Sequence, residues 1–206
     1  AGVRTAALIT NMDSPLGSAV GNSLEVIESV EILKGKTSGD LWTVCRELSC
    51  RMLMLAGIGD KDECGRLVDE AVESGEALKR FEMMVKLQGG DVSYIEDTSK
   101  FRKASFSREV YAPADGYITH MDSEKIGLTA VLLGAGREKK DDDINHAAGI
   151  IIAAKTGDFV KRGELLATLF ADDESRLDGA ESRYLFAVSI GDKKPAEQPM
   201  ILDYID

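Results

Sequence analysis

Apolar residues recur at helical spacing through most of the first ninety residues of the chain. They stand three or four positions apart within residues 20–33, 41–55, 64–72 and 77–88, so each segment is predicted to form an amphipathic helix. Because the leucine and methionine stripes follow the helical period, we expect these side chains to form a hydrophobic core.

Short polar signals mark the ends of these predicted helices. Asp60 and Glu63, three residues apart, resemble a capping box at the start of the third helix. Gly75 is expected to close that helix, and the pair Gly89 and Gly90 to stop the fourth. The polar residues between the apolar segments therefore indicate loops rather than one continuous helix.

The apolar run Thr5–Thr10 has no helical period and is bounded by a Gly and an Asn. Such a run is typical of a strand buried on both faces, as in a parallel sheet. A strand of this kind needs neighbours on both sides, and the chain has no initiator Met. We therefore expect the sequence to be the C-terminal part of a longer protein.

The pattern changes after residue 90. Residues 91–107 are polar without clear periodicity and are predicted to be a linker. Two helices are expected beyond it, one from about Ser123 and one over residues 174–190. The predicted strands are Glu109–Ala112, Tyr117–His120, Ile150–Lys155, Leu165–Phe170 and Met200–Ile205. Strands and helices that do not alternate strictly predict an α+β domain.

Two segments with turn residues, 112–118 and 155–169, resemble the halves of a biotinyl/lipoyl-type barrel-sandwich. The second contains two turns, at Gly157 and at Gly163. A carrier domain of that type needs a lysine on an exposed hairpin tip, usually between methionines. The chain has His120–Asp122 near that place and no Met-Lys pair, so a carrier function is not expected.

Composition narrows the class of protein. The chain is 44% hydrophobic and 30% charged, which excludes low-complexity disorder. Its longest apolar runs are far shorter than the ~20 residues of a membrane span. The formal net charge of −11 disfavours nucleic-acid binding, because an acidic surface repels phosphate backbones. Cys45, Cys50 and Cys64 fall in predicted helices without CxxC spacing, so we expect buried, reduced thiols and a cytoplasmic location.

Three further motifs do not by themselves indicate a catalytic or binding site. Gly134–Arg137 follows a predicted helix and is interpreted as a helix cap in preference to an anion-binding turn. Asp141–Asp143 lacks the alternate spacing of a calcium loop. His120 and His146 have no triad or metal spacing, so structural roles are expected for both.

The most informative segment is residues 7–28, in which a strand, a turn rich in small residues and a helix follow one another. Glu25 and Glu28 lie about one turn apart on that helix and could face one site. A buried carboxylate there would need a cation or backbone donors as partner, and loop carbonyls with a carboxylate suit a hard cation. A solvated helix face fits the same pattern, so both interpretations stay open.

Four separate sequence motifs resemble those of one known protein family. ALITNMDSPLGSAVGNSLEVIESV, GDVSYIEDTSK, YAPADGYITHMDSEKIGLTAVLLGAGR and GDFVKRGE occur in this order and resemble the pyrimidine-nucleoside phosphorylase and thymidine phosphorylase family. The resemblance covers essentially the whole chain as the C-terminal half of such a protein. It implies that residues 1–106 are the C-terminal, helix-rich part of an α/β domain. Residues 107–206 would form the C-terminal α+β, barrel-sandwich-like domain.

The resemblance also implies a function. Members are cytoplasmic homodimeric pentosyltransferases that convert a pyrimidine nucleoside and phosphate into the free base and a (deoxy)ribose 1-phosphate. Their phosphate-binding Lys-His-Ser segment and their base-binding Arg, Ser and Lys have no counterpart here, so no catalytic or cofactor-binding residue is expected and the chain alone should be inactive. The alternatives are a non-enzymatic binding or scaffold module and a phosphorylase specific for thymidine.

One site of the family maps onto this chain. Bacterial members hold a potassium ion with backbone oxygens of a PLG-x-A turn and a carboxylate of the following helix. The matching positions are Leu16, Ala19 and Glu28, and two further ligands of the family have no counterpart in this chain. The resemblance therefore implies a partial potassium site at these three residues.

Overall fold

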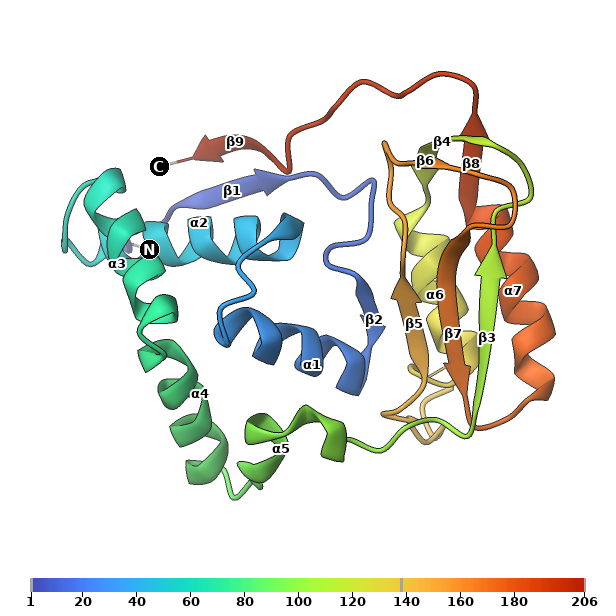
Figure 1. The fold of residues 1–206 in the computed structure, drawn as a ribbon. Helices are drawn as coiled ribbons and strands as arrows, with labels where there is room; N and C mark the ends of the chain where they lie inside the picture. The colour runs from blue at the N-terminus through green and yellow to red at the C-terminus, as the bar shows by residue number, and fades with distance from the viewer. Residues whose placement is uncertain (1, 138, 206) are drawn as a thin grey trace. The chain divides into compact units, whose positions relative to one another are not determined.

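The computed structural model describes residues 2–137 and 139–205, which fold into two compact units (Figure 1). The helical unit comprises Ala1–Asn11, Ser29–Lys100 and Gln198–Asp206. The sheet unit comprises Met12–Glu28 and Phe101–Glu197. Each unit thus joins segments that are distant in sequence. The predicted division after residue 106 concerns the domains of a longer protein and stays a prediction.

Helices dominate the helical unit, largely where the apolar period predicts them, and α1 is divided between the two units after Glu28. Their bounds are α1 Asn22–Leu33, α2 Gly39–Leu55, α3 Lys61–Glu73, α4 Glu76–Leu87, α5 Ser93–Glu96 and the 3₁₀ helix η1 Thr98–Lys100. The predicted cap is confirmed, because the Asp60 carboxylate accepts the Glu63 backbone N–H at 2.9 Å. The predicted linker, residues 91–107, contains the short helices α5 and η1.

The strand predicted at Thr5–Thr10 forms as β1, Ala7–Thr10, but its predicted environment is wrong in this structure. It pairs antiparallel with β9, Ile201–Ile205, in a two-stranded sheet. Its residues alternate between exposed and half-buried, and Ile9 is 43% exposed. The run is apolar on both faces, yet within the described residues no second strand and no full covering layer reaches it.

Tyr204 anchors β9 to the helices. The Arg51 guanidinium lies 4.5 Å and the Lys61 ammonium 4.8 Å from the centre of its ring. The buried Glu47 carboxylate lies 3.3 Å from the Lys61 ammonium and 3.8 Å from the Arg51 guanidinium. Because the two cations share one carboxylate and one aromatic ring, β9, α2 and α3 are held at a common point.

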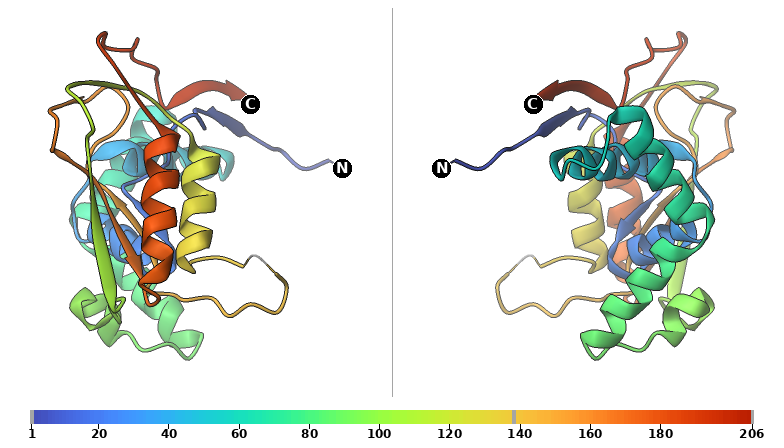
Figure 2. Two further views of the ribbon diagram at one scale, coloured as in Figure 1. Left: turned by 90° about the vertical axis from the view of Figure 1, so that its right-hand side faces the viewer. Right: turned by 90° about the vertical axis from the view of Figure 1, so that its left-hand side faces the viewer.

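The sheet unit contains two antiparallel sheets (Figure 1). The larger has the order β2-β5-β7-β3, and the smaller has the order β6-β4-β8. Strand bounds are β2 Ala19–Gly21, β3 Phe106–Tyr111, β4 Gly116–Met121, β5 Gly149–Ile152, β6 Phe159–Val160, β7 Leu165–Ala171 and β8 Val188–Gly191. Helices α6, Ser123–Leu133, and α7, Ser175–Ala187, pack against each other (Figure 2). The predicted α+β class is confirmed.

The hydrophobic core lies in the sheet unit, between these helices and the strands. Its largest fully buried side chains include Tyr184, Ile118, Met121, Ile126, Leu133, Ile150, Leu166 and Leu169. The turns predicted within 155–169 are confirmed: Asp158 accepts the Lys155 N–H at 2.8 Å, and Glu164 accepts the Lys161 N–H at 2.9 Å.

The predicted helix over residues 174–190 is too long. It ends at Ala187, and residues 188–191 form β8, which pairs with β4. Val188 and Ile190 are β-branched, and the register places Ile190 opposite Ile118 of β4. Tertiary pairing therefore ends a helix that the local pattern extends.

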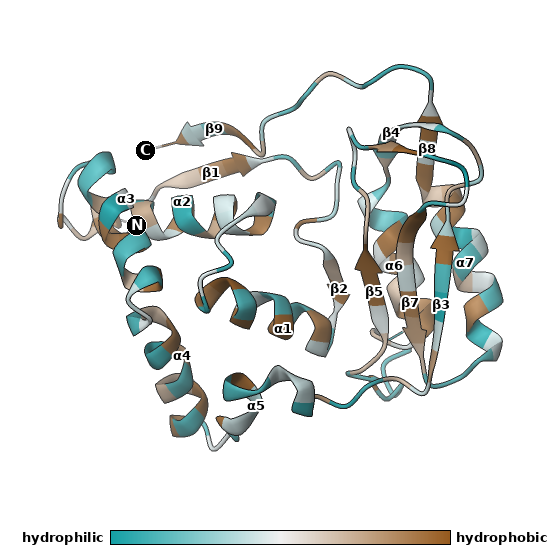
Figure 3. Cartoon of the chain, in the orientation of Figure 1, coloured by the Kyte–Doolittle hydropathy of each residue, from teal (hydrophilic) through white to brown (hydrophobic). Residues whose placement is uncertain are grey.

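The predicted core of the helical unit is also wrong in this structure. Met52 is 69% exposed, Leu48 and Met84 are each 45% exposed, and Leu67 is 37% exposed. Hydrophobic and hydrophilic residues alternate along α4 in Figure 3, whereas β5 is hydrophobic throughout. The helical period is right, but much of the apolar stripe has no covering layer among the described residues.

The cysteines lie in helices as predicted: Cys45 and Cys50 in α2 and Cys64 in α3. Cys50 and Cys64 are buried, but Cys45 is exposed, which corrects the prediction for that thiol. Within the described residues, no helix is both long and apolar enough to cross a membrane.

Candidate functional site

The segment singled out by the sequence forms one loop-and-helix element at the edge of the larger sheet. The loop after residue 11 leads into β2, and α1 begins directly after it at Asn22. β2 pairs with β5 in the register Ala19↔Ile151 and Gly21↔Gly149. The Ile152 N–H donates to the Ser18 carbonyl at 2.7 Å. The loop is therefore fixed by the sheet at the point where the helix starts.

Glu28 folds back from the second turn of α1 onto that loop. Its carboxylate accepts the backbone N–H of Ser18 at 2.6 Å and that of Ala19 at 3.1 Å. Gly17 has φ +73°, and a Cβ there would lie 2.6 Å from the Glu28 Oε2 atom. The loop backbone thus approaches the carboxylate as closely as a glycine allows.

Glu25 and Glu28 act on successive parts of the same strand. The Glu25 carboxylate accepts the Gly21 N–H at 2.9 Å, while Glu28 binds the N–H groups of Ser18 and Ala19. The sequence left open whether these carboxylates have partners or face solvent. In the structure, both carboxylates accept hydrogen bonds from backbone N–H groups. Charge-assisted bonds of this kind are stronger than bonds between neutral groups. Glu25 is exposed and Glu28 is half-buried, so the two side chains brace the loop from a helix face that is partly in contact with solvent.

The three positions that match the family's potassium ligands all lie in this loop-and-helix element. Leu16 is 43% exposed, Ala19 is 4% exposed, and Glu28 reaches the Ala19 backbone directly. Carbonyl and carboxylate oxygens are the donors that hard cations take. Among the described residues no group of three or more His, Cys, Asp or Glu side chains is arranged to hold a metal. A cation here would therefore depend on backbone oxygens in addition to Glu28.

The start of α1 is docked onto the segment between α6 and β5. The Asn22 amide donates to the Ala135 carbonyl at 2.8 Å, and the Ser23 N–H donates to the His146 carbonyl at 3.0 Å. Gly134 caps α6 in the left-handed conformation, which confirms the predicted cap. The Arg137 side chain is exposed. These backbone contacts give the segment a positioning role rather than a chemical one.

A polar cluster that the sequence did not reveal lies around Asp172, at the end of β7. Arg102 donates to the Asp172 carboxylate at 2.6 Å, and the Ser105 N–H donates to it at 2.8 Å. The Asn145 amide donates to the same carboxylate at 2.9 Å. The bonds to Arg102 and Ser105 lower the pKa of Asp172 to about 2. The members of this cluster are far apart in the sequence, so no local motif identifies it.

The two histidines and the aspartates of residues 141–143 do not come together in a site within the described residues. His120 and His146 have exposed side chains, and the latter contributes a backbone carbonyl. Asp142 accepts the Lys139 N–H at 2.8 Å within an exposed loop. Asp141 and Asp143 are exposed, as expected for a solvated loop.

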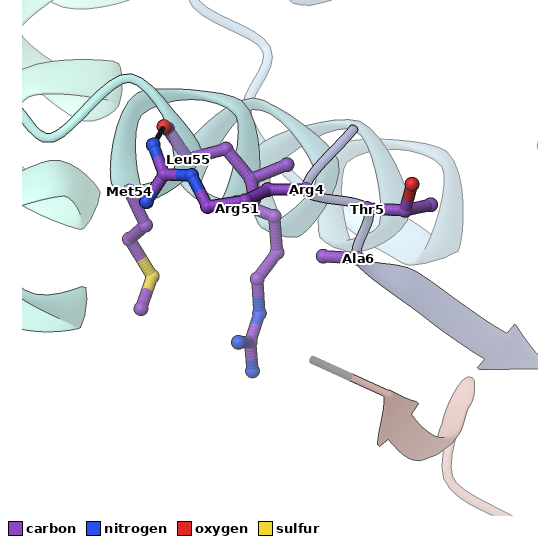
Figure 4. Close-up of a pocket in the computed structure, with 6 residues that line it drawn as sticks. All are labelled: Arg4, Thr5, Ala6, Arg51, Met54 and Leu55. Atoms are coloured by element: carbon purple, nitrogen blue, oxygen red, sulfur yellow. Dashed lines mark hydrogen bonds between the residues drawn. The ribbon is translucent and has the colours of Figure 1, made fainter. Parts of the chain in front are cut away.

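A cavity of about 490 Å³ in the helical unit is lined by two arginines (Figure 4). Figure 4 shows the Arg4 guanidinium bonded to the Leu55 carbonyl, with the Arg51 side chain extending away from it. Arg51 faces the Glu47 carboxylate and the Tyr204 ring. Because both guanidinium groups are engaged and point apart, they do not form a joint anion site.

Comparison with known proteins shows which proteins this chain resembles. Residues 117–191, which run from β4 to β8, match the family described as the pyrimidine nucleoside phosphorylase C-terminal domain. The chain is similar to pyrimidine-nucleoside phosphorylases, as its sequence motifs predict, and the residues that match the family model belong to the C-terminal domain of such proteins.

Three relatives named pyrimidine-nucleoside phosphorylase define the extent of the match. The one from Bacillus subtilis is 41% identical over 175 residues, which are 84% of this chain and 40% of the relative. The one from Geobacillus stearothermophilus is 36% identical over 184 residues, 89% of this chain and 42% of the relative. The one from Staphylococcus aureus strain USA300 is 36% identical over 192 residues, 93% of this chain and 44% of the relative. The chain thus spans about two fifths of the length of these relatives.

Proposed function

We propose that this chain is the C-terminal portion of a pyrimidine-nucleoside phosphorylase. The whole protein would transfer a pentosyl group from a pyrimidine nucleoside to phosphate, releasing the free base and a (deoxy)ribose 1-phosphate. The names of the relatives and the matched C-terminal domain support this proposal. The whole protein is further proposed to be a cytoplasmic homodimer, which light scattering of the whole protein would test.

The transfer of a pentosyl group requires catalytic groups that we do not expect this chain to contribute. An oxocarbenium-like transition state needs a positioned phosphate nucleophile and donors that polarise the departing base. The loop-and-helix element offers acceptor carboxylates already bonded to backbone N–H groups, not donors for a base or an oxyanion. This chain would therefore support the active site rather than perform the transfer.

The position of Glu28 supports a second part of the proposal, a potassium site. The carbonyl oxygens of Leu16 and Ala19 and the Glu28 carboxylate would hold the ion. When bound, the ion would supply positive charge near the phosphate-binding part of the whole enzyme. Support comes from the Glu28 carboxylate, which lies against the loop that contains the other two residues.

The activity is tested by phosphate-dependent release of uracil from uridine and of thymine from thymidine. We expect no release by this chain alone and release by the longer polypeptide that contains it. The ratio of the two substrates would separate a broad pyrimidine enzyme from one specific for thymidine. Absence of phosphorolysis by the longer polypeptide would contradict the proposal and favour a binding or scaffold role.

The potassium site is tested by Glu28→Gln in the longer polypeptide. Loss of the negative charge should raise the potassium concentration needed for half-maximal activation by about tenfold, since one full ligand charge is removed. Glu25→Gln is the matched control, because Glu25 also bonds a backbone N–H of β2 but is not a proposed ligand. Equal potassium dependence of the Glu28 variant and the wild type would contradict the site.

A further inference from the structure

The segment between α6 and β5 is pinned at Asn145, which is half-buried. The amide nitrogen of its side chain donates to the Asp172 carboxylate at 2.9 Å. The amide oxygen accepts the Ala147 backbone N–H at 3.1 Å and an N–H of the Arg102 guanidinium at 2.6 Å. The Asn145 backbone N–H donates to the Gly134 carbonyl at 2.9 Å. A single residue therefore joins the polar cluster at the end of β7 to both ends of this segment.

The same segment presents two carbonyl groups to the start of α1. The first N–H groups of a helix have no partner within the helix. One of them, the Ser23 N–H, donates to the His146 carbonyl at 3.0 Å, and the Asn22 amide donates to the Ala135 carbonyl at 2.8 Å. His146 directly follows Asn145 in the sequence. The residue that is pinned to the polar cluster thus stands next to one that holds the helix.

The contact between β5 and β2 allows little movement of one strand without the other. Gly149 of β5 lies opposite Gly21 of β2, with φ values of +152° and +147°. A Cβ at Gly21 would lie 2.7 Å from the Ala148 carbonyl oxygen, and a Cβ at Gly149 would overlap the Val20 carbonyl oxygen. Because the two backbones touch without an intervening side chain, a shift at the start of β5 would displace β2 and the loop before it.

We propose that Asn145 is a positioning residue for Glu28 and for the loop that Glu28 binds. Asn145 holds the segment whose carbonyl groups dock the start of α1, and α1 in turn places the Glu28 carboxylate against the Ser18 and Ala19 N–H groups. Asn145 thus acts through α1 and β2. The consequence for the whole enzyme rests on the proposed potassium site, whereas the positioning itself is a property of this chain.

A merely structural role would have a different signature. If Asn145 only stabilised the sheet unit, its loss would loosen the loop and the central strand β7 to the same extent. A positioning role loosens the loop selectively, because local opening of one element costs less free energy than opening of the core. Amide hydrogen exchange distinguishes the two roles, since it measures the opening of individual N–H groups.

The experiment follows amide exchange by NMR in this chain, without substrate or potassium. The reporters are the N–H groups of Ser18, Ala19 and Ser23, and the reference is the slowest-exchanging N–H groups of β7. Asn145→Ala should speed exchange at the reporters by about tenfold relative to the reference, because several hydrogen bonds of the segment are lost. Equal acceleration of the reporters and of β7, or no acceleration of the reporters, would overturn the proposal.

Two further variants bracket this result. Asn22→Ala removes only the contact with the Ala135 carbonyl, and it should speed exchange at the reporters by about threefold even if Asn145→Ala does not fold. Asp158→Ala is the matched control, because it removes a side-chain acceptor of a backbone N–H, that of Lys155, in the turn before β6 of the same unit. The control should leave the reporters unchanged relative to β7. Equal effects of Asn22→Ala and Asp158→Ala would contradict the positioning role.

A second measurement uses the longer polypeptide. Asn145→Ala should raise the potassium concentration needed for half-maximal activation by about threefold and leave kcat at saturating potassium within about twofold of the wild type. A lower kcat at saturating potassium with an unchanged potassium requirement would overturn the positioning role. A wild-type enzyme without potassium dependence would contradict the potassium site instead, and the exchange rates of Ser18 and Ala19 would still decide the role of Asn145.

Discussion

Gly17 shows at the residue scale how the loop before α1 is built. Two requirements coincide there: a left-handed backbone with φ +73°, and contact with the Glu28 carboxylate that leaves no room for a Cβ. Gly163 meets only the first requirement, with φ +82° and open space within 4 Å of the point where a Cβ would lie. The pair therefore separates backbone strain from displacement of the carboxylate.

We expect Gly163→Ala to lower the free energy of unfolding by about 1 kcal/mol, the cost of a left-handed alanine. Gly17→Ala should cost about 2–3 kcal/mol, since it also displaces Glu28 from the Ser18 and Ala19 N–H groups. Urea unfolding of both variants measures the difference. Equal losses would show that the Glu28 contact adds nothing to the stability of the loop.

The Asp172 cluster operates at the scale of elements. The carboxylate at the end of β7 bonds Arg102 and Ser105, which precede β3, and Asn145, which precedes β5. The Asn145 side chain in turn accepts the Ala147 N–H at 3.1 Å. One ionised group at the end of β7 therefore fixes the connections that lead into β3 and β5, the two strands that flank β7 in the larger sheet.

This cluster predicts a pH dependence of stability. The pKa of Asp172 falls from 3.8 to about 2 on folding, so its contribution is complete above about pH 4 and is lost as the pH falls through 2. Asp172→Asn should destabilise the chain at pH 5, and its difference from the wild type should shrink between pH 4 and pH 2. Urea unfolding at pH 5, 3.5 and 2 tests this expectation.

Asp141→Asn is the control for that series, because Asp141 lies in an exposed loop outside the cluster. Its difference from the wild type should stay small at all three pH values. A constant difference between Asp172→Asn and the wild type would show that the ionised form of Asp172 does not hold the cluster.

At the scale of the whole molecule, the two units differ in how completely they are buried. The sheet unit encloses a continuous core, in which Ile118, Met121 and Tyr184 are fully buried. The helical unit leaves methionines and leucines of α2 to α4 exposed, and an apolar groove in it is lined by residues of α1, α2, α3 and α4. The chain as a whole carries a net charge of −11, whereas the lining of this groove includes no charged residue.

Local patterns predicted most of the elements. The helical period, the Asp60 cap and the terminal glycines placed α2, α3 and α4 nearly to their ends, because these signals act within a few residues. The sequence also singled out the loop-and-helix element with Glu25 and Glu28. Pattern alone left the partners of these carboxylates open, since a helical period does not say what a side chain faces.

By itself, the sequence determined the family resemblance, the α+β class and the identity of the residues in the segment that leads to Glu28. Only the tertiary structure decided that Ile190 lies in a strand, that Glu28 binds the backbone of Ser18 and Ala19, and that Asp172 gathers distant partners. It also decided that the Met52 stripe is exposed in this chain. The physical reason is that an amphipathic period shows which face of an element is apolar, whereas the surface that covers this face comes from residues far away in the chain.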